Sequence, residues 1–253
     1  MKKKAVAVVM TAVMALGMVS AVSVQAGIED KTLIVGFDAE YPPYGYMDEN
    51  GEYTGFDLEL AQAVCDLEGW ELEKKPINWD SKDMELNSGS IDCIWNGFTM
   101  NGREDDYTFS EPYVDNSQVI VVADDSGIEK LTDLAGKTVG VQAASAALDL
   151  LQSEEEGGQK ELADTFGALN EFADYNTAFT ELQAGALDAL AIDVGVAKYQ
   201  LNSRGEGFKI LDETLNTEQY AIGFKKGNTE LCDIVNADLQ KLADDGTVAE
   251  LAE

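Results

Sequence analysis

A short pattern occurs twice in this chain and restricts the folds that the chain can adopt. Residues 85–94 are ELNSGSIDCI and residues 181–190 are ELQAGALDAL, so both fit E-L-x-x-G-x-[I/L]-D-x-[I/L]. The end of a helix, a glycine stop and an apolar strand account for each copy. A helix-glycine-strand match is common by itself, but here each strand also runs into a polar residue, Asn96 or Asp193. The repeat therefore predicts two similar α/β lobes.

Two such lobes would form a cleft between them. Ligands of open α/β sheets lie beyond the carboxyl ends of the strands. The first copy leads into residues 91–103, where an apolar run stops at an Asn-Gly pair and a polar loop begins. The loop offers the backbone of Gly97, the hydroxyl of Thr99 and Arg103, one of only two arginines in the chain. A guanidinium can hold a carboxylate by two parallel hydrogen bonds. Considered alone, Arg103 would be explained as a solvated charge that pairs with acidic residues of its own loop. The repeat is the reason for preferring a ligand-binding role.

The amino terminus has the pattern of a secretory signal. Three lysines are followed by an apolar run to about Val22 and by small residues that end at Ala26. We expect residues 1–26 to be removed on export, to a periplasm or the outer cell surface. The remaining 253 − 26 = 227 residues could bury one large core or two small ones.

Charge and composition exclude several functions. The formal net charge is −31, and removal of the three signal lysines gives −34, which disfavours nucleic acid or an anionic lipid surface as a partner. The chain has no histidine, so histidine triads and histidine metal sites are unavailable, and we expect no metal or cofactor. Cys65, Cys93 and Cys232 could form one disulfide in any of three pairings, although Cys65 and Cys93 fit better as small core residues.

Candidate ligand contacts follow the predicted strands of the first lobe. Apolar runs and helical spacing predict strands at 32–37 and 70–77 and a helix over 56–67. Asp38 directly follows the first strand, and Tyr41 lies in the loop after it, which two prolines stiffen. Trp79 follows the second strand, where stacking on a ligand and ordinary core packing are equally good explanations.

The second lobe offers a complementary set of groups. We predict a strand at 118–122 that crosses between the lobes, strands at 138–141, 171–174, 187–192 and 208–211, and a helix at 177–184. The strand at 138–141 opens onto a tight turn and a helix over 142–151. Free N–H groups at that helix start, near Ser145 and Ala146, would attract a carboxylate, and Ser145 can also serve as the N-cap. Asp193, after the repeated strand, is suited to bind an ammonium group.

The carboxyl-terminal part is predicted to return to the first lobe. Residues 220–224 are typical of a returning strand, and 231–251 of a closing helical region that is broken at Asp244-Asp245-Gly246. The lobes are accordingly placed at 27–117 for the first part of lobe 1, 118–218 for lobe 2, and 219–253 for the return.

The order and spacing of several short motifs resemble those of bacterial extracellular solute-binding proteins of family 3, the polar amino acid receptors of ABC importers. The motifs are Gly36-Phe37-Asp38, Tyr41-Pro42-Pro43, Gly55-Phe56-Asp57, Ile91-Asp92, Pro112-Tyr113, Val139-Gly140-Val141-Gln142 and Asp245-Gly246-Thr247. Two positions depart from the family pattern, because one residue fewer separates Thr99 from Arg103 and Ala144 stands where glycine is common.

The resemblance implies an α/β, two-lobed periplasmic-binding-protein-like fold of type II, with two hinge strands and the ligand cleft between the lobes. It also assigns roles to residues. Arg103 and Thr99, with N–H groups near Ser145 and Ala146, would hold an α-carboxylate, and Asp193 with the Asn96-Gly97 region would hold an α-ammonium. Tyr41 and Trp79 would enclose the ligand side chain, and Asp38, Asn96, Phe98 and Gln142 would select it.

The expected function is therefore capture of an L-amino acid and its delivery to ABC permease subunits in the membrane, by a monomer that is not an enzyme. Asp38 favours a polar or cationic ligand side chain, and the apparent lack of a second basic residue near the cleft disfavours an acidic one. The alternative is a secreted enzyme resembling cyclohexadienyl dehydratase on the same fold. Such an enzyme would use Asp38 or Glu40 as a general acid.

Overall fold

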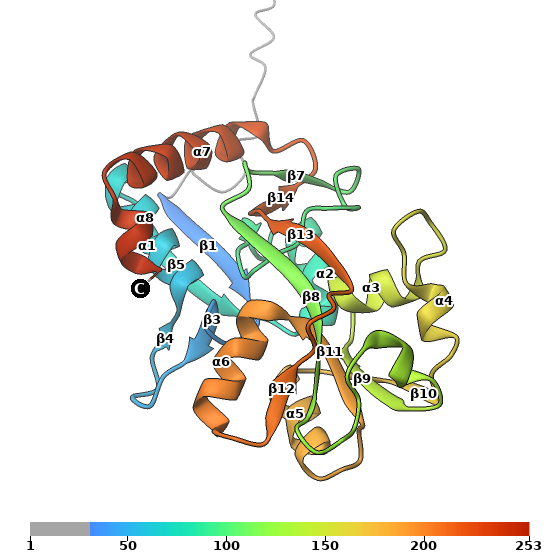
Figure 1. Ribbon diagram of the computed structural model, residues 1–253. Helices are drawn as coiled ribbons and strands as arrows, with labels where there is room; N and C mark the ends of the chain where they lie inside the picture. The colour runs from blue at the N-terminus through green and yellow to red at the C-terminus, as the bar shows by residue number, and fades with distance from the viewer. Residues whose placement is uncertain (1–30, 253) are drawn as a thin grey trace, which may run out of the picture.

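The computed structural model describes residues 31–252, so the predicted signal at 1–26 lies outside the described residues. Two sheets occupy separate halves of the molecule, and the helices cover their faces (Figure 1). This arrangement confirms the predicted α/β architecture of two lobes. None of the helices within the described range is long and apolar enough to span a membrane.

The first sheet is built from both ends of the chain. Its strand order is β5 (Glu71–Pro76), β1 (Thr32–Phe37), β6 (Cys93–Ile94), β14 (Gly223–Lys225) and β7 (Tyr107–Phe109). One face packs against α1 (Phe56–Glu68), α7 (Thr229–Asp244) and α8 (Thr247–Leu251), and α2 (Lys82–Ser88) covers the other. Cys65, Cys93 and Cys232 are free and buried in this lobe, as was expected for Cys65 and Cys93.

The second sheet contains the middle of the chain. Its order is β10 (Ala168–Phe172), β9 (Thr138–Gln142), β11 (Ala189–Asp193), β8 (Val114–Ala123) and β12 (Phe208–Ile210), with β13 (Asn216–Tyr220) also paired to β8. The helices of this lobe are α3 (Ala146–Gln152), α4 (Lys160–Ala163), α5 (Tyr175–Gln183) and α6 (Val194–Arg204). Short elements complete the fold: β2 (Glu40–Tyr41), β3 (Gly45–Met47), β4 (Tyr53–Thr54), η1 (Trp79–Ser81) and η2 (Leu131–Leu134).

The two copies of the repeat have the same local structure. Each helix, α2 or α5, is followed by a glycine in the left-handed region, Gly89 at φ 77° and Gly185 at φ 75°. The repeated aspartate then joins its segment to the parallel strand beside it, β1 in lobe 1 and β9 in lobe 2. Asp92 Oδ2 accepts a hydrogen bond of 2.8 Å from Ile34 N, and Asp188 Oδ2 accepts one of 2.8 Å from Thr138 N. The repeat is therefore structural, and it positions the loops that follow it.

The chain passes between the sheets twice, from β7 into β8 and from β13 into β14. β8 and β13 run antiparallel, with Val114 opposite Tyr220 and Gln118 opposite Asn216. The predicted returning strand at 220–224 is wrong in its bounds: it is divided between β13 and β14, because the N–H of Ile222 bonds to the Ser110 hydroxyl instead of continuing the ladder. The lobe boundaries at 117/118 and 218/219 fall inside these two crossing strands and remain predictions.

Candidate ligand-binding site

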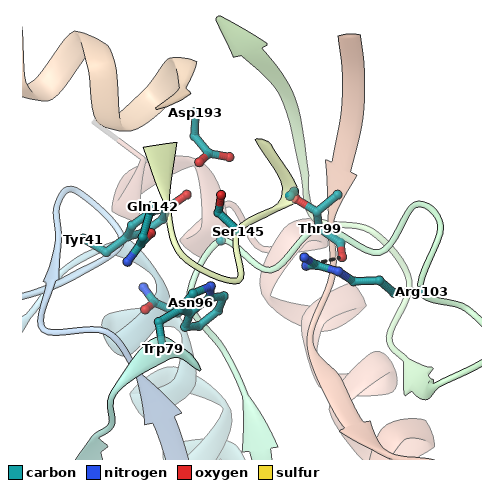
Figure 2. A pocket seen from close by; sticks show the side chains of 10 residues that line it. Tyr41, Trp79, Asn96, Thr99, Arg103, Gln142, Ser145 and Asp193 are labelled. Atoms are coloured by element: carbon teal, nitrogen blue, oxygen red, sulfur yellow. Dashed lines mark hydrogen bonds between the residues drawn. The ribbon is translucent and has the colours of Figure 1, made fainter. Parts of the chain in front are cut away.

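A narrow pocket lies between the two lobes, and the lobes leave about 10 Å³ free in it, which is room for about one water molecule. Its lining brings together predicted residues from both lobes (Figure 2), namely Tyr41, Trp79, Asn96, Gly97, Thr99, Arg103, Gln142, Ser145, Ala146 and Asp193. Two further predicted residues, Asp38 and Phe98, are buried but do not line this pocket.

The loop after β6 forms one wall, and Gly97 sets its path. Gly97 has φ +55°, and its N–H donates to Asp57 Oδ2 at the start of α1. A Cβ at this position would lie 2.9 Å from the ring of Tyr41 and 3.0 Å from the ring of Tyr220. Only glycine can therefore place this backbone so close to the two rings.

Two backbone hydrogen bonds join the chain on either side of Thr99 to residues 219–221. Met100 N donates to Gln219 O at 3.0 Å, and Ala221 N donates to Phe98 O at 3.0 Å. Among residues 31–252, the N–H of Thr99 itself has no protein acceptor, which leaves it available to a ligand. Its hydroxyl is engaged, because it donates to Glu218 Oε1 at 2.8 Å.

Arg103 is fixed at the edge of the pocket by three neighbours. Its Nη2 bonds to Asp149 Oδ2 at 2.7 Å, and its Nη1 bonds to Thr99 O at 3.4 Å. The guanidinium carbon lies 5.0 Å from the centre of the Phe98 ring. The Phe98 ring therefore packs against the guanidinium. It takes this position instead of making the predicted contact with the ligand side chain.

The opposite wall is the turn between β9 and α3. Ser145 is the N-cap of α3, since its hydroxyl accepts a hydrogen bond of 3.1 Å from Leu148 N. Ala144 has φ +54°, a left-handed conformation that costs a residue with a side chain roughly 1–2 kcal/mol. This left-handed conformation explains why glycine is common at this position in the family. Lys82 Nζ from the other lobe donates to the Ala144 carbonyl at 3.1 Å and thereby holds the turn.

Lys82 corrects one premise of the sequence analysis. It is a second basic residue beside the cleft: it is buried, and its Nζ lies 5.2 Å from the centre of the Trp79 ring. Burial is the first cause that lowers the pKa of its ammonium, and the charge of Arg103 is the second. No sequence pattern indicated this position, because a lysine at the start of a short helix is normally solvated.

Asp193 presents two oxygens with different surroundings. Oδ1 accepts three hydrogen bonds, from Tyr220 Oη at 2.6 Å, Gln118 Nε2 at 2.6 Å and Asn116 Nδ2 at 2.8 Å. Among the described residues, the one hydrogen-bond partner of Oδ2 is Tyr175 Oη, at 3.5 Å. Because Oδ1 is saturated, Oδ2 is the oxygen that can receive an ammonium group.

Four partners of this site escaped the sequence analysis: Asn116, Gln118, Glu218 and Tyr220. They alternate at i and i+2 on β8 and β13, so each pair lies on one face of its strand. Polar residues at this spacing, in a strand that crosses between the lobes, could have indicated this network from the sequence.

Asp38 lies behind Trp79 and joins the lobes. Its Oδ1 accepts from Glu40 N at 2.9 Å, and its Oδ2 accepts from Gln142 Nε2 at 2.7 Å. Burial, opposed by these hydrogen bonds, raises the pKa of Asp38 to about 6. The groove on this side of Trp79 is acidic, since the described residues that line it include no lysine or arginine. Its carboxylates are those of Asp38, Glu40, Asp80, Glu85, Glu171 and Asp174, of which Glu85 pairs with Lys75 at 3.0 Å.

Two α/β lobes that close on a pocket with a cation on one side and a carboxylate on the other define a type II periplasmic solute receptor. Within that class, the chain belongs to the bacterial extracellular solute-binding proteins, family 3, whose model matches residues 33–253.

Relatives of known specificity cover most of the chain. The L-cystine-binding protein TcyJ of Escherichia coli K12 is 29% identical over 253 residues, which is 95% of this chain and 92% of that protein. The arginine-binding extracellular protein ArtP of Bacillus subtilis is 34% identical over 225 residues, 87% of this chain and 84% of that protein.

Solved structures agree with the fold. A substrate-binding protein of an ABC uptake transporter from Streptococcus pneumoniae with bound histidine has a TM-score of 0.82 at 34% identity, over 88% of this chain and 91% of that one. An ancestral arginine-binding protein bound to arginine has a TM-score of 0.78 at 38% identity, over 87% and 96%.

Proposed function

We propose that this protein captures an L-amino acid with a cationic side chain outside the cytoplasm and delivers it to the permease subunits of an ABC importer. The proposal rests on one observation: the guanidinium of Arg103 and the nearly free Oδ2 of Asp193 belong to the same interlobe pocket. A zwitterionic α-amino acid carries the two complementary charges. The receptor would act as a monomer in a periplasm or at the outer cell surface.

Each lobe contributes half of the contacts in this proposal. The α-carboxylate would bind the guanidinium of Arg103, the free N–H of Thr99 and the N–H groups around Ala146. The α-ammonium would bind Asp193 Oδ2. A micromolar dissociation constant corresponds to about −8 kcal/mol, within reach of two charge-assisted contacts in a buried site.

The preference for a cationic side chain comes from the far end of the pocket. A side chain that passes between Tyr41 and Trp79 would reach Asp38 and the acidic groove beyond it. Lys82 does not oppose this preference, since its ammonium is directed to the Ala144 carbonyl. Arginine specificity in ArtP and bound arginine in the ancestral receptor support the same ligand class.

The dehydratase alternative has one observation in its favour. An aspartate with a pKa near 6, such as Asp38, is suited to general acid catalysis near neutral pH. Against it, the relatives named above are binding proteins. We expect no turnover of prephenate by the purified protein.

A thermal unfolding screen tests the proposal. Residues 27–253 are measured against the twenty amino acids, cystine, ornithine and prephenate. A ligand at a thousandfold excess over its Kd stabilises the native state by about 4 kcal/mol, which raises Tm by roughly 8 to 16 °C in a chain of this length. We expect the largest rise with L-arginine or another cationic amino acid.

Two arginine variants make the screen specific. Arg103→Met should lose the rise. Arg204→Met should keep it, because Arg204 bonds to Gln200 and packs on Phe179 in lobe 2, outside the pocket. An unchanged rise in Arg103→Met, or no rise with any amino acid, would refute the assignment.

A further inference from the structure

Glu218 is a buried carboxylate that the binding scheme above does not use. It lies on β13 and is 5% exposed. Its Oε1 accepts hydrogen bonds from Thr99 Oγ1 at 2.8 Å, Asn116 Nδ2 at 2.8 Å and Gln118 Nε2 at 2.7 Å. The same two amide nitrogens also donate to Asp193 Oδ1. The carboxyl groups of Asp193 on β11 and Glu218 on β13 thus share two amide donors, which lie on β8.

The two carboxyl groups have matching arrangements. In each, one oxygen accepts three hydrogen bonds and the other is nearly free. The free oxygen of Asp193 is Oδ2, in the ligand pocket. The free oxygen of Glu218 is Oε2, whose only described partner within residues 31–252 is Asn216 Nδ2 at 3.4 Å. Glu218 lines an outer cavity together with Asn216 and Thr217, and this cavity gives Oε2 a route to solvent. The outer cavity adjoins the ligand pocket, since Thr99, Arg103 and Ala146 line both.

No cation neutralises this pair within the described part of the chain. The ionisable groups that face Asp193 of β11 and Glu218 of β13 are tyrosines: Tyr175 of α5, Tyr220 of β13, and Tyr41 and Tyr44 of the first lobe. Arg103 is directed instead to Asp149. Burial is the first cause that raises the pKa of Glu218, and the charge of Asp193 is the second. Both amide oxygens, Asn116 Oδ1 and Gln118 Oε1, lack a donor, because both amides turn their nitrogens to the carboxyl groups.

We propose that Glu218 holds a proton beside Asp193 in the ligand-free receptor and that the α-ammonium of the ligand, bound at Asp193, replaces this proton, so that capture releases it to solvent. The inference rests on the proposed function. Charge is conserved in the exchange: two carboxylates with one proton carry −1, and two carboxylates with one ammonium also carry −1. Glu218 is therefore a positioning residue, which acts on the ligand through Asp193 and Thr99.

The exchange also explains how Thr99 is used. In the complex, the ionised Glu218 still accepts the hydrogen bond that the Thr99 hydroxyl donates. A threonine has one hydroxyl proton to donate. The backbone N–H of Thr99, and not its hydroxyl, is then the group that meets the ligand carboxylate.

The first test needs no ligand. The free energy of unfolding is measured from pH 4 to pH 8 for wild type, Glu218→Gln and Glu155→Gln, the last being an exposed glutamate on the rim of the outer cavity. A carboxyl group with a raised folded pKa stabilises the protein fully below its unfolded pKa, and this contribution is lost as the pH rises through the folded pKa. The folding constant of Glu218→Gln should therefore rise relative to wild type above about pH 4.5, by up to tenfold per pH unit. A difference that stays flat to pH 8, as in the control, overturns the proposal.

The second test uses L-arginine as the probe. Titration calorimetry at pH 6, in two buffers of different ionisation enthalpy, gives the number of protons released per ligand. We expect wild type to release more than Glu218→Gln, and the release common to both belongs to Asp38. If arginine binds and the two proteins release the same number, the inference fails and the proposed function stands. If no amino acid binds, the proposed function fails, and the unfolding titration still decides whether the proton is held.

A spectroscopic measurement covers the case in which Glu218→Gln does not fold. Infrared difference spectra of Asp38→Asn, in which Asp38 contributes no carboxyl band, should show the loss of a protonated carboxyl band when L-arginine binds. Glu155→Gln in the same background should show the same loss. A spectrum without that change contradicts the exchange.

Discussion

Asp38 is subject to two opposing influences on its pKa. In the ligand-free protein, burial raises this pKa to about 6, although Glu40 N and Gln142 Nε2 both donate to the carboxylate. A cationic ligand side chain in contact with Asp38 would favour the ionised form and lower the pKa. Binding and ionisation of Asp38 are therefore linked.

This linkage predicts a pH dependence of affinity. Above pH 6 Asp38 is ionised before the ligand arrives, and affinity for L-arginine should be constant with respect to this group. Below pH 6 the carboxyl group must lose a proton on binding, so Kd should rise by up to tenfold per pH unit. Calorimetry between pH 4.5 and 8 measures the slope. Asp38→Asn should bind more weakly at pH 8 and show a shallower slope; an equal slope in the variant would remove Asp38 from the contact.

At the scale of elements, α1 controls the loop that forms the pocket wall. Asp57 lies in the first turn of this helix, is fully buried, and accepts the Gly97 N–H on Oδ2. Its Oδ1 has no hydrogen-bond partner among the described residues. Burial raises the pKa of Asp57 to about 7. The helix therefore holds the loop with a carboxyl group that is costly to ionise.

Two substitutions at Asp57 separate the hydrogen bond from the charge. Asp57→Ala leaves the Gly97 N–H unpaired and should cost about 1–3 kcal/mol of unfolding free energy. Asp57→Asn keeps an acceptor without the charge. Since the folded pKa of about 7 exceeds the unfolded value of 3.8, the wild type loses stability between pH 4 and 7 that the asparagine variant keeps, by up to about 1.4 kcal/mol per pH unit. Urea unfolding at pH 4.5 and 8 measures both effects, and equal behaviour of the two variants would contradict this division.

The sequence was sufficient to predict elements whose apolar pattern is continuous. The strand at 32–37, the helix that starts at Phe56 and the break at Asp244-Asp245-Gly246 are confirmed. The strand after the first repeat is shorter than its apolar run, since only Cys93–Ile94 belongs to β6. Apolar character records burial, and burial continues through Trp95 after the sheet pairing has ended.

The pocket itself was largely predictable, because its residues follow strand ends. The exceptions have physical reasons. Phe98 neighbours Gly97 in the chain, but its side chain turns into the core beneath Arg103. Lys82 reaches the cleft along a flexible side chain from a helix, and Glu218 belongs to a polar strand that sequence alone presents as solvated. Contacts of this kind depend on how two distant segments meet, which local patterns do not encode.

At the scale of the whole molecule, the closed arrangement is held by contacts that cross the pocket. They join Arg103 to Asp149, Lys82 to Ala144, Asp38 to Gln142, and Glu40 to Asn176. Asp149 is exposed, so its hold on Arg103 is weak, and a ligand carboxylate can replace it in the pocket. Asn116 and Gln118 of the hinge strand β8 join Asp193 of β11 to Glu218 of the hinge strand β13. Ligand capture and proton release would therefore occur together in the closed arrangement.

The central claim is that both charged α-groups of the ligand are clamped between the lobes. The most direct measurement is the calorimetric Kd of residues 27–253 for L-arginine and for agmatine, which has the same side chain and amine but no carboxylate. Loss of hydrogen bonds to a charged group costs about 1.5–3 kcal/mol each, so agmatine should bind at least roughly a hundredfold more weakly. Equal affinity for the two compounds would contradict the clamp and the receptor function that depends on it.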